Sequence, residues 1–425
     1  ELNDSGIWIT RTDHAMVGRF NYAAQVIDGA LVGPAGEVEV LQQDDTVLIY
    51  DQVGGTASPV DVANLEVAGT ANLPEGARAA MGALAAAVLD VDAGTLWVLP
   101  VVELPFFSAE STEPVVEELP QDGALAVGVD GTVHVATAGD ATLRSIPTDE
   151  NGRPGEMRTR RLADVGAGDE LKVTTVGSDA VVHDRTTGVL HLPGKRVDAD
   201  DAVRLQRPGP RNDSVVYATE SALVVQPLGG GTPAVTDAQG GAEPAAPVFV
   251  KGCAYGAWSD GGRVVRDCPG EGDDRLEAVQ VSAGGKLRFR VNRDMVVLNE
   301  LVSGSVWLAD QDFELYESWD DVLPSQTSDA DESDATPEQS RDPLQDRDLP
   351  NRPPEAIDDS YAVRPGRTTV LPVLNNDTDP DGDALIAAVR GAGPSIGLVQ
   401  EILGGEALQI TVPPDASGQA SFEYE

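Results

Sequence analysis

Short apolar segments alternate with glycine-containing turns through the first three-quarters of the chain. Within residues 46–50, 180–183 and 295–298 the apolar positions suit strands, and the repeating units lack helical apolar spacing over ten residues. The Ala-rich run 77–89 is the exception, because its composition is compatible with a helical turn. The pattern therefore predicts an all-β structure.

One unit recurs along this region: a strand, a Gly turn, and a strand that opens with an aromatic residue or His. Copies begin at Gly94, Gly131, Gly188 and Gly304, with a shortened copy at Gly6. Their spacings fit steps of roughly 40 residues, which is the length of a β-propeller blade. We expect a β-propeller over residues 1–324, with seven blades favoured and eight as the alternative. The N-terminal strands would close the ring or form a half blade.

The histidines are interpreted as packing residues. His134 and His191 hold the position that Trp97 and Trp307 hold in sister copies, which predicts a ring of side chains between blades. His183 comes from the preceding strand and would bring only two histidines together, too few for a metal site.

The chain has two cysteines, Cys253 and Cys268, on either side of a Gly-Gly turn. That arrangement places both at the open end of one hairpin, where cross-strand neighbours reach disulfide geometry. Two buried free thiols are the alternative. A disulfide would indicate an oxidising, extracytoplasmic location.

Composition changes at residue 325. Residues 325–353 are rich in acids and proline and show no apolar periodicity, which predicts an extended, flexible linker. An ordered strap along the propeller is the alternative. Short strands separated by turn signals follow over residues 354–425 and predict a β-sandwich.

This last part resembles a known family. The segments 351–354, 358–359 and 374–383 resemble the bacterial Ig-like or cadherin-like repeat of large surface proteins. More weakly, segments 3–8, 252–254 and 318–321 make the N-terminal part similar to the propeller-like ectodomain of actinobacterial multi-Ig surface proteins. The resemblance implies an extracellular cell-surface location, a membrane anchor before residue 1 and more Ig-like modules after residue 425.

Charge narrows the list of partners. The chain has 71 acidic and 29 basic residues, a formal charge of −42. Nucleic acid and anionic membrane surfaces are therefore excluded as partners, because both require basic protein surfaces. Apolar runs are too short to span a bilayer, so we expect contact with a membrane only through an anchor outside this sequence.

An acidic loop in the C-terminal part is a candidate calcium site. Asp377, Asp379 and Asp381 alternate and precede Gly382, as in the first half of a calcium-binding loop. An EF-hand is excluded because position twelve is Ala388 and no helices flank the loop. A metal-free turn held by its own side chains is an equal alternative. The full set of candidate ligands is Asp358, Asp359, Asp377, Asp379, Asp381 and Asp383.

No catalytic motif has the context it needs. The G-x-S-x-G match at 393–397 lacks a following helix and a nearby His. We expect a non-enzymatic cell-surface protein whose propeller is a binding or docking head on an Ig-like stalk, in adhesion or cell-envelope interaction with a protein or polysaccharide. The alternative is a propeller enzyme that acts on carbohydrate through acidic residues at the ring mouth. Carboxylates about 5–10 Å apart in the central funnel would favour the enzyme, and a plugged mouth would favour binding.

Overall fold

The computed structural model divides into two compact units, residues 1–327 and 328–425, each of which is considered by itself. Residues 325–351 of the predicted linker lie outside the described residues. Among the described helices, all short 3₁₀ turns, none could cross a membrane. The described residues are 6–34, 38–269, 274–322, 352–361, 363–365, 368–371, 373–378, 385–391, 393–402, 407–413 and 416–425.

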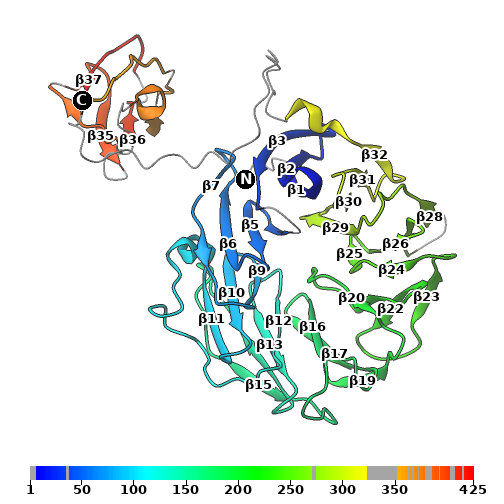
Figure 1. The fold of residues 1–425 in the computed structure, drawn as a ribbon. Coiled ribbons are helices and arrows are strands. Elements are labelled where there is room, and N and C mark those ends of the chain that lie inside the picture. The colour runs from blue at the N-terminus through cyan, green and yellow to red at the C-terminus, as the bar shows by residue number, and fades with distance from the viewer. Residues whose placement is uncertain are drawn as a thin grey trace, which may run out of the picture. The chain divides into compact units, whose positions relative to one another are not determined.

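The first unit is a ring of eight antiparallel sheets, the blades of a β-propeller (Figure 1). In each blade the strands pair in chain order from the ring centre outward, except that in blades 2 and 7 two successive strands pair with the same neighbour. Blades 1 to 4 contain β1 (Gly6–Arg11), β2 (Met16–Asn21), β3 (Val26–Val32); β4 (Glu39–Gln43), β5 (Thr46–Asp51), β6 (Thr56–Asp61), β7 (Glu66–Val67), β8 (Ala71–Asn72); β9 (Arg78–Gly82), β10 (Ala85–Asp90), β11 (Thr95–Pro100); and β12 (Ala124–Val127), β13 (Val133–Thr137), β14 (Thr142–Ile146), β15 (Arg158–Arg161).

Blades 5 to 8 repeat the four-stranded plan, with one extra inner strand in blade 7. The 3₁₀ helices η1 (Thr12–His14), η2 (Val101–Phe106) and η3 (Ser318–Asp321) lie outside the sheets. The strands are β16 (Leu171–Val176), β17 (Asp179–Asp184), β18 (Val189–Leu192), β19 (Lys195–Asp198); β20 (Arg204–Leu205), β21 (Ser214–Ala218), β22 (Ala222–Pro227), β23 (Ala234–Asp237); β24 (Ala242–Pro244), β25 (Val248–Val250), β26 (Cys253–Asp260), β27 (Arg263–Asp267), β28 (Arg275–Ala278); and β29 (Leu287–Asn292), β30 (Met295–Glu300), β31 (Val306–Leu308), β32 (Glu314–Tyr316).

The structure confirms the propeller and corrects the favoured count of seven blades to the alternative of eight. Gly94, Gly188 and Gly304 each precede the third strand of a blade, but Gly131 precedes the second strand, β13. The copies were therefore not all equivalent. The copy at Gly6 begins a three-stranded blade of its own, so the N-terminal strands do not form a half blade but close the ring by packing against blade 8.

A capped turn after the second strand supplies the repeat signal. Asp51 accepts bonds from the backbone N–H groups of Val53 and Gly54 at 3.0 and 2.8 Å. Asp184 and Glu300 bond the corresponding backbone N–H groups in blades 5 and 8. Such side-chain acceptors stabilise a turn by pairing its free donors. Much of the acidic composition therefore serves local turn structure.

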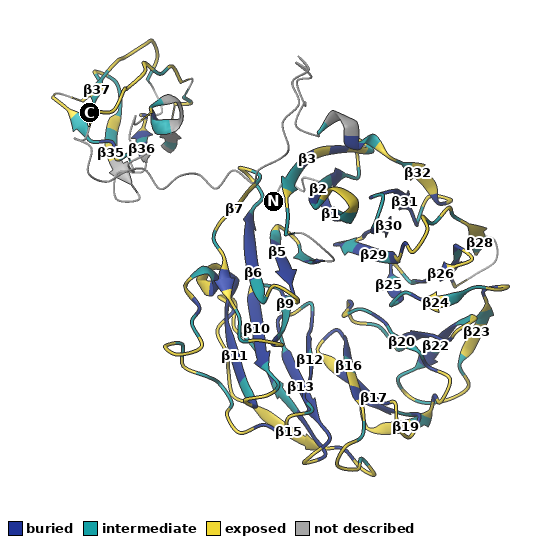
Figure 2. Cartoon of the chain, viewed as in Figure 1, coloured by how far each residue is buried: buried dark blue, intermediate teal, exposed yellow. Residues whose placement is uncertain are grey.

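The expected helical turn at residues 77–89 is wrong: β9 and β10 occupy this segment. Its small side chains allow close packing between blades. Ala86 and Val88 join the core shared with blade 2, and Ala87 and Leu89 join the core shared with blade 4. This alternation is the two-residue period of a strand buried on both faces. Such interblade cores bury the inner and middle strands, whereas outer strands such as β15 and β19 are largely exposed (Figure 2).

The ring closes without exchange of strands between its first and last blades. Instead, the buried amide of Asn299 on β30 pairs with the backbone of Thr10 on β1, accepting from its N–H at 2.9 Å and donating to its carbonyl at 3.1 Å. The amide of Gln42 accepts from the N–H of Trp8 and donates to the carbonyl of Gly6, both at 3.0 Å. Side-chain amides thus take the place of a neighbouring strand along the inner edge of β1.

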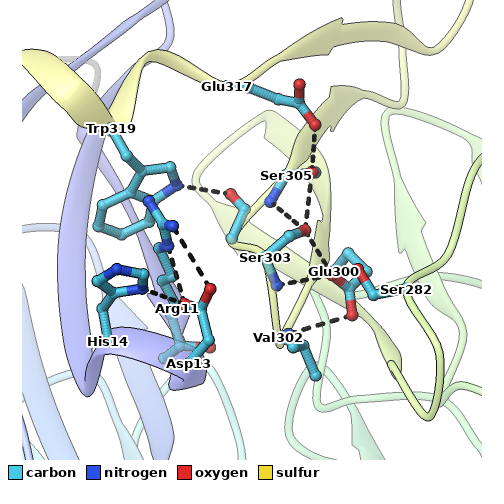
Figure 3. Close-up of polar contacts among 12 residues, drawn as sticks. Arg11, Asp13, His14, Ser282, Glu300, Val302, Ser303, Ser305, Glu317 and Trp319 are labelled. Atoms are coloured by element: carbon cyan, nitrogen blue, oxygen red, sulfur yellow. Dashed lines mark hydrogen bonds and ion pairs between the residues drawn. The ribbon is translucent and has the colours of Figure 1, made fainter.

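Trp319 is buried in the core between blades 1 and 8, beside Arg11 (Figure 3). Its indole N–H donates to the carbonyl of Gly304 at 2.9 Å, and the Arg11 guanidinium lies 5.8 Å from the ring centroid. A Cβ on Gly18 of β2 would come within 2.6 Å of the indole ring, so glycine is needed there. The segment 318–321, part of the family resemblance, therefore joins blade 8 to blade 1.

The second unit contains two small antiparallel sheets. Its core side chains are Leu371, Val373, Ala387, Leu408, Ile410 and Val412. The elements are β33 (Thr368–Leu371), η4 (Val373–Asn376), β34 (Val389–Arg390), β35 (Leu398–Ile402), β36 (Ala407–Thr411) and β37 (Glu423–Tyr424), with sheet orders β33-β36-β35 and β34-β37.

Replacing Asn299 with Ala should reduce the free energy of unfolding of the propeller by about 2–3 kcal/mol, because the buried backbone groups of Thr10 lose their partner. Denaturant titration followed by Trp fluorescence measures this unit alone, since all five Trp residues precede residue 320. Asn64→Ala, which removes an exposed amide, is the control and should cost under about 0.5 kcal/mol. Equal costs for the two variants would contradict the closure described here.

Candidate functional site

The ring axis is occupied by one carboxylate and three guanidinium groups. Glu39 begins the inner strand of blade 2. Its carboxylate is bonded by Arg207 of blade 6 at 2.8 Å, by Arg290 of blade 8 at 2.9 Å, and by Arg288 of blade 8. Since blades 2 and 6 lie opposite each other in an eight-membered ring, the Glu39–Arg207 ion pair crosses the ring centre.

Burial makes these charges interdependent. The Glu39 side chain is 22% exposed and that of Arg290 is 3% exposed. Burial alone would raise the pKa of Glu39, but attraction by Arg207, Arg290 and Arg288 lowers that pKa to about 2. Burial, together with repulsion from Arg288 and Arg207, lowers the pKa of Arg290 to about 9. The attraction of Glu39 opposes this shift only in part. Loss of Glu39 would therefore leave buried positive charges without their shared partner.

This geometry bears on the choice between binding and catalysis. A general acid must hold a proton near the working pH, and Glu39 is ionised throughout the ordinary range. The described side chains that bond its carboxylate are guanidiniums, not a second carboxylate. The axis is thus plugged by an ion cluster that connects distant blades.

The predicted disulfide is confirmed. Cys253, the first residue of β26, is bonded to Cys268, which follows β27, with the two Cα atoms 4.2 Å apart. The bond closes the open end of this hairpin in blade 7. It restricts the unfolded chain and so stabilises the fold.

His134, His183 and His191 are buried among the blades. Burial lowers the pKa of His134 to about 4, and its Nδ1 lies 2.8 Å from the Ser145 hydroxyl. His191 shares the third-strand position of Trp97, as expected, whereas His134 lies on a second strand. In the part of the chain that the structure describes, no three His, Cys, Asp or Glu groups are arranged to hold a metal.

Only part of the acidic loop can be placed. Asp379, Asp381 and Asp383 lie outside the described residues, and Asp358 is exposed. Asp359 and Asp377 do come together, although 18 positions separate them in the sequence. Both accept from the hydroxyl of Tyr424, with Asp359 Oδ2 at 3.0 Å and Asp377 Oδ2 at 3.1 Å.

Two backbone carbonyls complete a cage of oxygens around Tyr424. The carbonyl oxygens of Ile357 and Val373 each lie 3.2 Å from the Tyr424 hydroxyl. Partial burial and the anions Asp359 and Asp377 raise the pKa of Tyr424. One hydroxyl proton cannot pair with all of these acceptors, so several electron-rich oxygens face each other in a small space.

Residues of the Glu39 cluster can be recognised in the sequence as charges that stand among apolar neighbours. Arg288 and Arg290 alternate with apolar residues on an inner strand, where charges are unexpected without a partner. Glu39 likewise stands between Val38 and Val40. Their partnership could not be predicted, because it depends on the closure of the ring.

Comparison with known proteins identifies the C-terminal unit. The family model described as Bacterial Ig domain matches residues 351–425, so the chain ends in a bacterial Ig domain. No curated protein matches the chain.

Several solved structures are similar to this chain at low sequence identity. The dihydro-heme d1 dehydrogenase NirN, in complex with DHE, has a TM-score of 0.53 at 14% identity, over 74% of this chain and 73% of that one. Apo AztD from Citrobacter koseri has a TM-score of 0.48 at 12% identity, over 73% and 93% of the chains. BamB from Moraxella catarrhalis has a TM-score of 0.44 at 16% identity, over 72% and 93%. At such identities the NirN likeness shows the fold alone.

Glu39→Gln should destabilise the propeller at pH 7 by about 3 kcal/mol, because a pKa lowered from 4.5 to about 2 corresponds to that stabilisation of the ionised form. This contribution is complete above pH 4.5 and is lost as the pH falls towards 2. Denaturation followed by Trp fluorescence at several pH values should therefore show that the difference in free energy of unfolding between wild type and variant decreases over that pH interval.

The control for this measurement is Glu103→Gln, which removes an exposed ion pair with Arg153. We expect this substitution to change the free energy of unfolding little at any pH. If the difference in free energy of unfolding between wild type and Glu39→Gln stayed constant from pH 7 to pH 2, the pairing of Glu39 with its three Arg partners would be contradicted.

Proposed function

We propose that the chain is part of a non-enzymatic extracellular protein, in which the propeller is a binding head and the Ig domain belongs to a stalk. The observation that carries this proposal is the plugged axis. Glu39 is fixed in its ionised form by three guanidiniums, so it is not suited to be the general acid of a carboxylate pair that cleaves polysaccharides.

Two further features support an extracellular location. The Cys253–Cys268 disulfide persists in oxidising compartments. The bacterial Ig domain at residues 351–425 fits the multi-domain surface proteins that the sequence resembles. Adhesion or attachment to the cell envelope, with a protein or polysaccharide partner, is the role that this architecture favours.

A carbohydrate-cleaving propeller enzyme is the competing proposal. It requires paired carboxylates in the central funnel, and the described contacts of Glu39 are cationic instead. Rigid interblade packing with capped turns suits a scaffold that presents its loops and rims to a partner.

We also propose that the Ig domain binds calcium through the acidic loop. The supporting observation is the oxygen cage of Asp359, Asp377 and two carbonyls around Tyr424. Carboxylate and carbonyl oxygens are the ligands that Ca²⁺ prefers, and a hard cation would relieve their mutual repulsion. The remaining carboxylates would come from Asp379, Asp381 and Asp383.

The binding-head proposal predicts exposure outside the cell without catalysis. Protease added to intact cells that express the natural protein should remove its propeller epitope while a cytoplasmic marker survives. The purified chain, incubated with a panel of bacterial cell-wall polysaccharides, should release no reducing ends or unsaturated products. Protection from protease would contradict the location, and release of reducing ends or unsaturated products from any of the polysaccharides would contradict the non-catalytic role.

The calcium proposal predicts saturable Ca²⁺ binding by the whole chain in calorimetric titration at about 150 mM salt, where the charge of distant acids is screened. The double variant Asp359→Asn/Asp377→Asn should lose at least one binding site. Glu423→Gln, an exposed acid of the same unit, is the matched control and should bind as the wild type does. Identical isotherms for all three proteins would contradict the proposal.

A further inference from the structure

A basic groove lies on the outer side of the propeller, between blades 4 and 5. It has a volume of about 660 Å³ and is open to solvent along one side. Its walls come from the outermost strands β15 and β19 and from β18. Four cations and one carboxylate line it, in a chain whose formal charge is −42: Arg160, Arg161, Lys195, Arg196 and Asp198.

These cations meet because blades 4 and 5 are neighbours in the ring. Arg160 and Arg161 end β15, and Lys195 and Arg196 begin β19, 34 positions later. Two bonds tie the walls together: Arg160 donates to the Leu192 carbonyl and Arg196 donates to the Ala163 carbonyl, both at 3.3 Å. Because these bonds cross between blades, the groove keeps its shape without a ligand.

The groove also retains positive charge after internal pairing. Arg196 forms an ion pair with Asp164, and Asp179 attracts Arg160. In the part of the chain that the structure describes, neither Arg161 nor Lys195 forms an ion pair, although both are exposed. A cluster of cations in a concave surface concentrates anions locally, even on an acidic protein.

We propose that this groove binds a small ligand that carries at least two oxyanion groups, such as phosphates, sulfates or carboxylates. Its volume is that of a small-molecule site. A long polyanion is disfavoured by the formal charge of −42 on the chain. Arg161 and Lys195 would supply charge-assisted hydrogen bonds from opposite walls. In taking the groove as the recognition surface of the propeller, the inference rests on the proposed binding function.

His191 makes this site sensitive to pH. It lines the groove and lies directly across the β18–β19 ladder from Arg196. Burial lowers the pKa of His191, Arg196 and Arg160 lower it further, and Asp184 and Asp164 oppose them. A bound oxyanion would favour the protonated ring, so ligand binding and proton uptake should reinforce each other as the pH falls.

The direct test is calorimetric titration of the full chain with pyrophosphate at pH 7.5. We expect saturable binding that the double variant Arg161→Gln/Lys195→Gln weakens at least tenfold. The matched control is Lys172→Gln/Arg204→Gln, which removes one exposed Lys and one exposed Arg outside the groove and should change affinity less than twofold. Absence of binding by the wild type, or equal weakening in both variants, would overturn the proposal.

A second titration isolates the role of His191. Benzene-1,3-disulfonate keeps its charge between pH 7.5 and 5.5, so a change in affinity reports the protein. We expect affinity to rise severalfold at pH 5.5 in the wild type and to remain constant in His191→Gln. An equal rise in both would exclude His191 as the coupled group.

The two proposals fail separately. Protease protection in intact cells would overturn the extracellular head while leaving pyrophosphate binding in place. Loss of pyrophosphate binding would overturn the groove while leaving the location and the absence of turnover intact.

Discussion

The first and last blades of this eight-bladed ring exchange no strand. The backbone N–H and C=O groups on the inner edge of β1, the first strand, therefore need other hydrogen-bond partners. The structure meets this constraint with side chains. Asn299 from blade 8 and Gln42 from blade 2 pair with the inner edge of β1, and Trp319 is buried in the core between blades 8 and 1. The Glu39 cluster then connects blades 2, 6 and 8 across the centre. The integrity of the ring depends on these polar contacts as well as on apolar packing between blades.

This solution has a functional consequence. The charges at the ring axis pair with one another. The ring centre, where a propeller could hold a ligand, is therefore occupied by residues that connect the blades. Under the proposed function, the chemistry that recognises a partner would lie elsewhere, and the rim between blades 4 and 5 has both a cavity and cations exposed to solvent. The proposed recognition surface would then be separate from the residues that close the ring.

The sequence was informative about local features and weak about contacts between distant segments. Glycine turns and period-two strands predicted the propeller, and the spacing of Cys253 and Cys268 predicted their bond. The blade count was ambiguous because Gly131 mimics the third-strand turn while preceding a second strand. The Ala-rich run was ambiguous because small residues suit both a helix and the narrow space between blades. Neither the Glu39 cluster nor the groove could be predicted, since both bring together residues from separate blades.

Hydrogen exchange along β1 tests the closure most directly. The N–H groups of Trp8 and Thr10 lie on the inner edge of the sheet and bond only side-chain amides in the structure. If these amides replace a strand, both protons should exchange as slowly as those of the central strand β30, and Asn299→Ala should accelerate Thr10 selectively. Rapid exchange of Trp8 and Thr10 in the wild-type protein, as at a fraying edge, would contradict the account.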